Sequence, residues 1–157
     1  MRRDYFSLDV RQVSWVDDDG TPEKPTVAVT FDGPASTLRE RLTGPDGDYL
    51  TAAETDFAFR LQSTLDAADA TGVVSVTDRL TGDFVFELNE DADDILGLID
   101  AAREYAGATD ADDGHYHVVV RIDGEVAVEY DKDTFLVYDD GGNLLRQHSL
   151  IPSGVEL

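Results

Sequence analysis

The 157-residue chain contains no cysteine. This absence excludes a disulfide framework, a thiol nucleophile and any zinc or iron–sulfur site built from cysteine ligands. Lysine is nearly absent as well, and the only two lysines are Lys24 and Lys132. No apolar run exceeds a few residues, as at positions 118–120, so nothing in the sequence is long enough to span a bilayer. The first residues also lack an apolar signal segment, and we expect a cytoplasmic protein that does not bind membranes.

Basic residues are few overall, and acidic residues are in large excess. Thirty-four Asp and Glu stand against twelve Lys and Arg, which gives a net charge of −22. Repulsion at this density destabilises a compact fold in dilute buffer, whereas molar salt shortens the screening length to about 3 Å. The composition therefore predicts a protein adapted to concentrated salt. Direct binding to nucleic acid is not expected, because no cluster of basic residues exists beyond Arg2, Arg3 and the stretch LRERL.

Hydrophobic periodicity predicts an α+β fold with a mostly antiparallel sheet of about eight or nine strands and two helices. Alternation at positions 57–61 indicates one strand, and Phe84, Phe86 and Leu88 of another are expected to face the core. The helices are expected at about residues 34–43 and 90–107, with Asn89 as the N-cap of the second.

A single domain over residues 1–157 is expected, because the chain shows no repeat, low-complexity run or long linker. Its predicted order is β-β-α-β-β-β-α over residues 1–108. An apolar tail over 149–157 follows a four-strand meander over 115–148, with strands at 115–122, 125–130, 134–138 and 144–148.

Two of the three histidines, His115 and His117, stand one residue apart at the start of a predicted strand. Side chains at this spacing project to the same face, with Cα atoms roughly 6.5–7 Å apart, so two imidazoles can share a metal ion. His148 or one of the many carboxylates could supply a third ligand. Arg121 on the same face disfavours a cation site. The metal hypothesis names His115, His117 and His148, and the alternative is that they are ordinary strand residues.

The turn at Asp123 and Gly124 determines what covers the histidine face. A two-residue turn would place the apolar residues of the next strand, Val126, Val128 and Tyr130, on that face. A three-residue turn would place them on the valine face and leave the histidines exposed. The sequence leaves both possibilities open, and we favour exposed histidines.

No catalytic residue and no cofactor are predicted. The sequence has no nucleophile-elbow GxSxG, no P-loop and no dinucleotide fingerprint. Acidic loops such as DDDGTPEKP miss the ligand spacing of a calcium-binding EF-hand.

The C-terminal segment is apolar where chain ends are usually polar. It either docks onto its own sheet or reaches a protein partner or a second copy in a homo-oligomer. The candidate interaction residues are Leu150, Ile151, Val155 and Leu157.

The stretches DYFSLDV, FDGPASTLRERLTGPDGD, TGDFVFELNEDADDILGLI and TFLVYDDGGNLLRQHSLIPSGVEL together resemble an uncharacterised family of small acidic haloarchaeal proteins. The resemblance implies a salt-adapted cytoplasmic setting and transfers no catalytic residue. Three functional hypotheses follow. The first is a non-enzymatic module for protein interaction or self-association, the second is a small-molecule or metal-binding enzyme using His115 and His117, and the third is an acidic nucleic-acid mimic.

Overall fold

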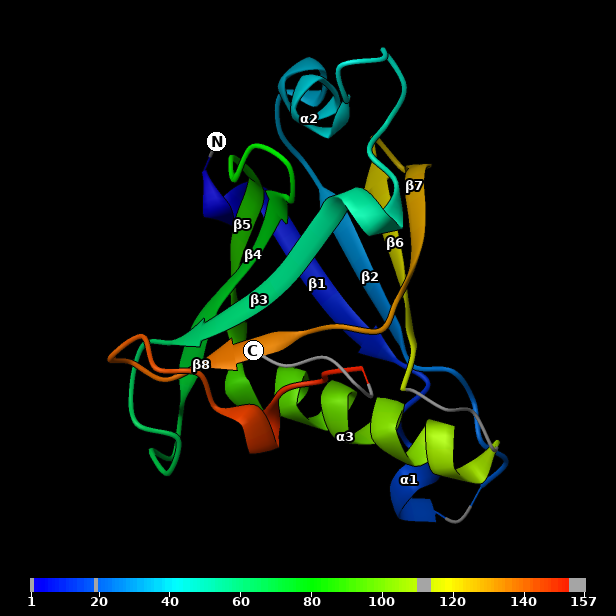
Figure 1. The fold of residues 1–157 in the computed structure, drawn as a ribbon, viewed down its shortest axis with the longest axis vertical. Coiled ribbons are helices and arrows are strands. Elements are labelled where there is room, and N and C mark those ends of the chain that lie inside the picture. Colours follow the sequence, from blue (N-terminus) through cyan, green and yellow to red (C-terminus); the bar gives the residue numbers. More distant parts are fainter. Residues whose placement is uncertain (1, 19, 110–113, 153–157) are drawn as a thin grey trace.

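The computed structural model describes residues 2–18, 20–109 and 114–152, and these residues form two four-stranded sheets with helices at their ends (Figure 1). The first sheet has the order β1-β2-β6-β7, with β1 at Phe6–Arg11, β2 at Thr26–Phe31, β6 at Tyr116–Ile122 and β7 at Glu125–Lys132. The second has the order β5-β4-β3-β8, with β3 at Thr55–Leu61, β4 at Thr71–Asp78, β5 at Phe84–Asp91 and β8 at Leu136–Tyr138.

Three α-helices and three short 3₁₀ helices complete the described part of the chain. The α-helices are α1 at Trp15–Asp18, α2 at Ala35–Leu42 and α3 at Ala92–Ala108, and the 3₁₀ helices are η1 at Arg3–Tyr5, η2 at Ala52–Glu54 and η3 at Arg146–His148. The expected α+β class with mostly antiparallel pairing is confirmed, since only β2–β6 and β3–β8 pair in parallel among the described residues. No helix among the described residues is long and apolar enough to cross a membrane.

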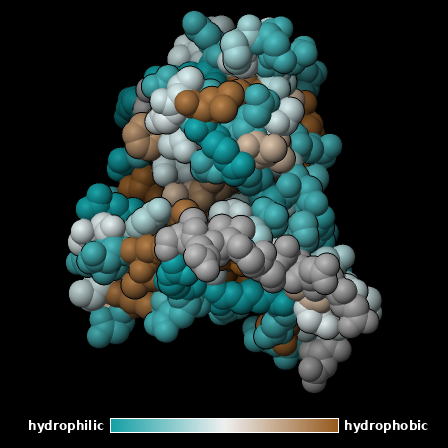
Figure 2. Space-filling model, viewed as in Figure 1, coloured by the Kyte–Doolittle hydropathy of each residue, from teal (hydrophilic) through white to brown (hydrophobic). Residues whose placement is uncertain are grey.

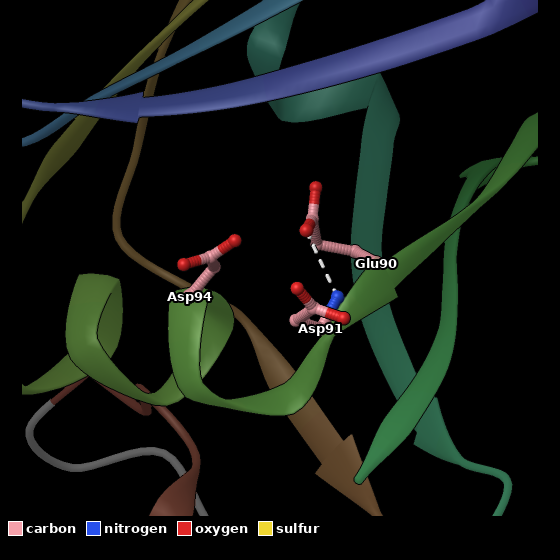
Figure 3. A group of neighbouring side chains, drawn as sticks. All are labelled: Glu90, Asp91 and Asp94. Atoms are coloured by element: carbon pink, nitrogen blue, oxygen red, sulfur yellow. Dashed lines mark hydrogen bonds between the residues drawn. The ribbon is translucent and has the colours of Figure 1, made fainter. Parts of the chain in front are cut away.

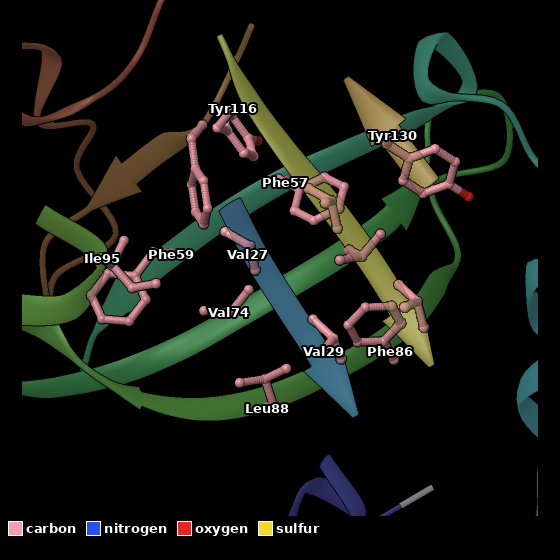
Figure 4. Close-up of a cluster of buried hydrophobic side chains, with 14 of the residues drawn as sticks. Val27, Val29, Phe57, Phe59, Val74, Phe86, Leu88, Ile95, Tyr116 and Tyr130 are labelled. Atoms are coloured by element: carbon pink, nitrogen blue, oxygen red, sulfur yellow. The ribbon is translucent and has the colours of Figure 1, made fainter. Parts of the chain in front are cut away.

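The core lies between the inner faces of the two sheets (Figure 4). Val27 and Val29 of β2 face Phe59 of β3 and Val74 of β4, and all four are at most 1 % exposed. Their period of two places every second residue of each strand inside. One cluster of buried residues includes side chains from both sheets and from α2 and α3.

The predicted four-strand meander over residues 115–148 is divided between the two sheets. Only β6 and β7 form a hairpin, after which the chain crosses to the second sheet and β8 pairs in parallel with β3. Phe135 explains the crossing, because its fully buried ring packs against Phe57 at a centroid distance of 6.1 Å. The fourth predicted strand is instead an isolated bridge at Leu144 followed by η3.

The β6–β7 hairpin combines a two-residue turn with a β-bulge. Asp123 and Gly124 have φ values of 54° and 80°, as a type I′ turn requires. Pairing then shifts, so that Arg121 lies opposite Val126 but Val120 lies opposite Val128. The unpaired Ala127 is the extra residue of the bulge. It reverses which side of the sheet the following side chains of β7 point to. Val128 therefore faces the core, while Val126 is 45 % exposed.

Helix α3 begins at Ala92, and Asn89 lies in β5 instead of capping the helix as predicted. The β4–β5 ladder continues to the pair Thr71–Asp91, and the N–H of Ala92 donates to the carbonyl of Ala70 at 2.9 Å. Strand pairing therefore occupies the residues that would otherwise form the first helical turn.

Two side chains of β7, Lys132 and Tyr130, donate hydrogen bonds to backbone carbonyls at the start of β3 and in the segment before it. Lys132, only 4 % exposed, donates from Nζ to the carbonyls of Ala52 at 2.6 Å and Thr55 at 2.7 Å. Tyr130 donates from its hydroxyl to the carbonyl of Leu50 at 2.8 Å. Burial lowers the pKa of Lys132, and nearby Arg79 lowers it further. These bonds attach the edge strand of the first sheet to the segment that leads into β3.

Candidate functional site

The outer face of the second sheet carries a hollow of about 470 Å³. Its strand residues form cross-strand rows, with Arg60 of β3 opposite Val73 of β4, and Ser75 of β4 opposite Glu87 of β5. The ring of Phe84 also lines the hollow and is 55 % exposed. A volume of this size with a few convergent polar groups is typical of binding sites.

Two arginines line this hollow, together with Asp140 and Glu87. The guanidinium of Arg60 donates to the backbone carbonyl of Asp140 at 3.3 Å. Arg3, in η1, is 3.4 Å from the carboxylate of Glu87. Both contacts are long for bonds that involve a charged donor. The two arginines that line the hollow therefore have hydrogen-bond donors left over.

A second hollow of about 440 Å³ shares Arg3 and Gln62 with the first and extends to Thr71 and Asp91. We call the two joined hollows the outer groove, lined in its length by Arg3, Arg60, Gln62, Thr71, Ser75 and Phe84. Ser75 and Thr71 lie four residues apart on β4, so the groove extends for roughly 13 Å along the strands.

A group of three carboxylates, Glu90, Asp91 and Asp94, lies where β5 meets α3 (Figure 3). Glu90 and Asp91 also line the second hollow of the outer groove. Glu90 accepts a hydrogen bond from the N–H of Asp91 at 2.8 Å, and Asp94 stands in the first turn of α3. Among the described residues, these three form the only set of possible metal ligands with atoms within 4.8 Å of one another. The positive end of the helix dipole accounts for carboxylates at this position.

The pKa of Glu90 is raised to about 7, because burial and the neighbouring Asp94 raise it by more than the hydrogen bond from the N–H of Asp91 lowers it. The folded state thus favours the protonated carboxyl. The contribution of the protonated Glu90 carboxyl to the free energy of unfolding is complete below the ordinary pKa of 4.5, and it is lost as pH rises through about 7.

Replacing Glu90 with glutamine is expected to raise the free energy of unfolding at pH 8 relative to wild type, and to leave it nearly unchanged at pH 4.5. The expected difference is about 1 kcal/mol, because this half-buried carboxyl is partly screened by solvent. Urea unfolding across this pH range measures it. Asp93→Asn, which changes an exposed carboxylate in the first turn of α3, is the matched control and should not reproduce this effect. A Glu90→Gln difference that does not grow with pH would contradict the prediction.

His115 and His117 lie near acidic side chains of β7. The Nδ1 atom of His115 is 3.5 Å from Asp131, and the Nε2 atom of His117 is 3.6 Å from Glu129. Asp131 also forms an ion pair with Lys24. Both imidazoles remain about one-third exposed.

His148 lies in η3, which packs against β8 and α3. Among the described residues, it forms no three-ligand group with His115 and His117. A metal role for the three histidines stays a prediction.

The C-terminal residues that the sequence singled out have different surroundings. Leu150 is 3 % exposed and exchanges two backbone hydrogen bonds with Phe135, at 2.9 and 3.0 Å. Ile151 is half-buried, while Val155 and Leu157 lie outside the described residues. The side chain of Leu150 is thus occupied within its own chain, and the interaction role of this segment stays a prediction.

Sequence reasoning missed Arg3, Arg60 and Phe84. The alternation of β3 could have placed Arg60 on the outer face, but the neighbouring strands were unknown. Phe84 was expected in the core and is exposed, because β5 carries a bulge. Thr77 pairs with Phe84 but Val76 pairs with Phe86, so Val85 is the extra residue and turns inward.

Comparison with known proteins assigns a family but no activity. No curated protein and no solved structure matches the chain. A family model described as "Family of unknown function (DUF5793)" matches residues 1–157. The chain therefore belongs to this family of unknown function.

Proposed function

We propose that the protein is a non-enzymatic binding module that holds an extended segment of a partner protein in the outer groove. The observation that carries the proposal is the exposed ring of Phe84 beside the two arginines in a groove about 13 Å long. An extended segment of about four residues fits such a length.

A second exposed apolar side chain in the same hairpin as Phe84 supports this proposal. Leu80 is 74 % exposed and stands four residues before Phe84 in the β4–β5 hairpin. The view in Figure 2 shows a mostly hydrophilic surface with scattered apolar residues. Aromatic and arginine side chains are enriched where proteins contact one another.

The proposal includes a setting of concentrated salt in the cytoplasm. A net charge of −22 and only two lysines support it. A protein partner is favoured over nucleic acid, because the sequence has no cluster of basic residues beyond Arg2, Arg3 and LRERL to bind a phosphate backbone.

The test compares Phe84→Ser with Val126→Ser, which removes an exposed apolar residue of similar accessibility from the first sheet. Complexes are recovered from native extract in molar salt, and self-association is measured by light scattering. We expect a defined complex with wild type and Val126→Ser that is lost with Phe84→Ser. Equal complexes with all three proteins would exclude the outer groove as the binding surface.

A further inference from the structure

We infer that Arg60 receives a carboxylate of the bound partner segment, so that an acidic residue beside an apolar residue is the feature that the groove selects. This inference rests on the proposed function and names the chemistry of its ligand.

Arg60 has no carboxylate partner among the described residues, although the chain has nearly three acidic residues for each Lys or Arg. Its bond to the Asp140 carbonyl is 3.3 Å long. By contrast, the exposed pairs Arg79–Asp56 and Arg2–Asp4 are 2.7 and 2.8 Å long. A guanidinium has five N–H donors in a planar fork that matches a carboxylate in two parallel bonds. Arg60 therefore has donors left for such a ligand.

Neighbouring side chains fit a carboxylate that is attached to an apolar group. Ser75 contributes a hydroxyl to the same hollow. The Oε1 atom of Gln62 accepts a hydrogen bond from Thr71 at 3.3 Å, which leaves its amide NH₂ group to donate. Val73 and Phe84 supply the apolar part of the lining. Glu87 pairs with Arg3, and Asp140 contacts Arg60 through its backbone carbonyl, so neither carboxylate is paired with Arg60.

The length of the groove favours a protein segment over a free small acid. A small acid would fill the hollow at Arg60 and leave the second hollow, at Gln62 and Thr71, uncovered. An extended segment can cover both hollows, with its acidic residue beside Arg60.

Salt should have an unusual effect on this interaction. The net charge of −22 repels an acidic ligand over a distance of about 10 Å at 0.1 M salt, but over only about 3 Å at 1 M. Contacts with Arg60 lie within that shorter distance. The affinity of the groove for a carboxylate should therefore increase as the salt concentration rises. An ordinary ion pair between a basic site and an acidic ligand instead weakens as salt is added.

The experiment uses isovalerate as a probe and isovaleramide as its uncharged equivalent, both followed by NMR on the full chain. Isovalerate is expected to shift the Nε–H signal of Arg60 and the amides of Val73 and Ser75, with affinity about tenfold above that of the amide. Arg60→Gln should lose this preference, and Arg121→Gln, an exposed arginine of the first sheet, should keep it. Raising the salt should strengthen isovalerate binding.

Equal binding of the two probes to wild type, or weaker isovalerate binding in high salt, would overturn the inference without needing any variant. The outcome is separable from that of the proposed function. If Phe84→Ser abolishes the partner complex while wild type does not distinguish the probes, the partner site stands and the carboxylate inference fails. If isovalerate binds selectively while Phe84→Ser leaves the complex intact, Arg60 serves a free small acid and the proposed function fails.

Discussion

Replacing Lys132 with alanine is expected to lower the free energy of unfolding by about 3 kcal/mol. The change removes two charge-assisted hydrogen bonds to the carbonyls of Ala52 and Thr55, together with the packing of a buried aliphatic stem. Burial lowers the pKa of Lys132, so the cost of desolvating the ammonium offsets part of the gain from these bonds. Urea unfolding in about 1 M salt, followed by Trp15 fluorescence, measures the effect.

Two variants separate the causes of this effect. Lys132→Met keeps most of the stem and removes the ammonium, and it should cost about half as much. Lys24→Ala removes the other lysine, whose ion pair with Asp131 is exposed, and should cost less than about 1 kcal/mol. If Lys132→Ala were as mild as Lys24→Ala, Lys132 would not secure β7 to the segment before β3.

Gly72→Ala in β4 is expected to lower the free energy of unfolding by about 3 kcal/mol, at the upper end of the usual range for an overpacked site. A Cβ atom there would lie 2.4 Å from the carbonyl oxygen of Arg60 and 2.5 Å from the Cζ atom of Phe59. Both neighbours belong to β3, which is paired with β4, so relief requires the two strands to separate locally. Because Arg60 itself would move, the outer groove should change shape as well.

Gly97→Ala is the matched control, since Gly97 lies within α3 and a Cβ there would meet nothing within 4 Å. This substitution should raise the free energy of unfolding by about 1 kcal/mol through helix propensity. The two glycine variants should thus have effects of opposite sign in the same urea experiment. Destabilisation by both, or by neither, would show that the close approach of β3 and β4 is not the cause.

Periodicity predicted most strands and both longer helices, because each buries every second residue or one helical face. It failed where a bulge adds one residue. Val85 in β5 moves Phe84 from the core to the surface, and Ala127 in β7 brings Val128 inside despite a two-residue turn. A bulge depends on the partner strand, so the pattern of one strand does not reveal it.

The outer groove could not be predicted from the sequence for a related reason. Its lining combines η1, three strands and the loop at Asp140, which are far apart in the chain. Parallel pairing of β8 with β3 carries that loop to Arg60, whereas the expected meander kept β8 beside β7. His115 and His117 were conspicuous in the sequence because histidine is rare. Arg60 was not, since isolated arginines on strands are ordinary.

The most direct test of the binding module is photo-cross-linking from the floor of the outer groove. A benzophenone amino acid is placed at Ser75 in the groove or at Thr30, a half-buried position of the first sheet, and cells are irradiated in their native salt. We predict one discrete adduct from position 75, lost in the Phe84→Ser background, and no such adduct from position 30. The same adducts from both positions, or none from position 75, would contradict the account.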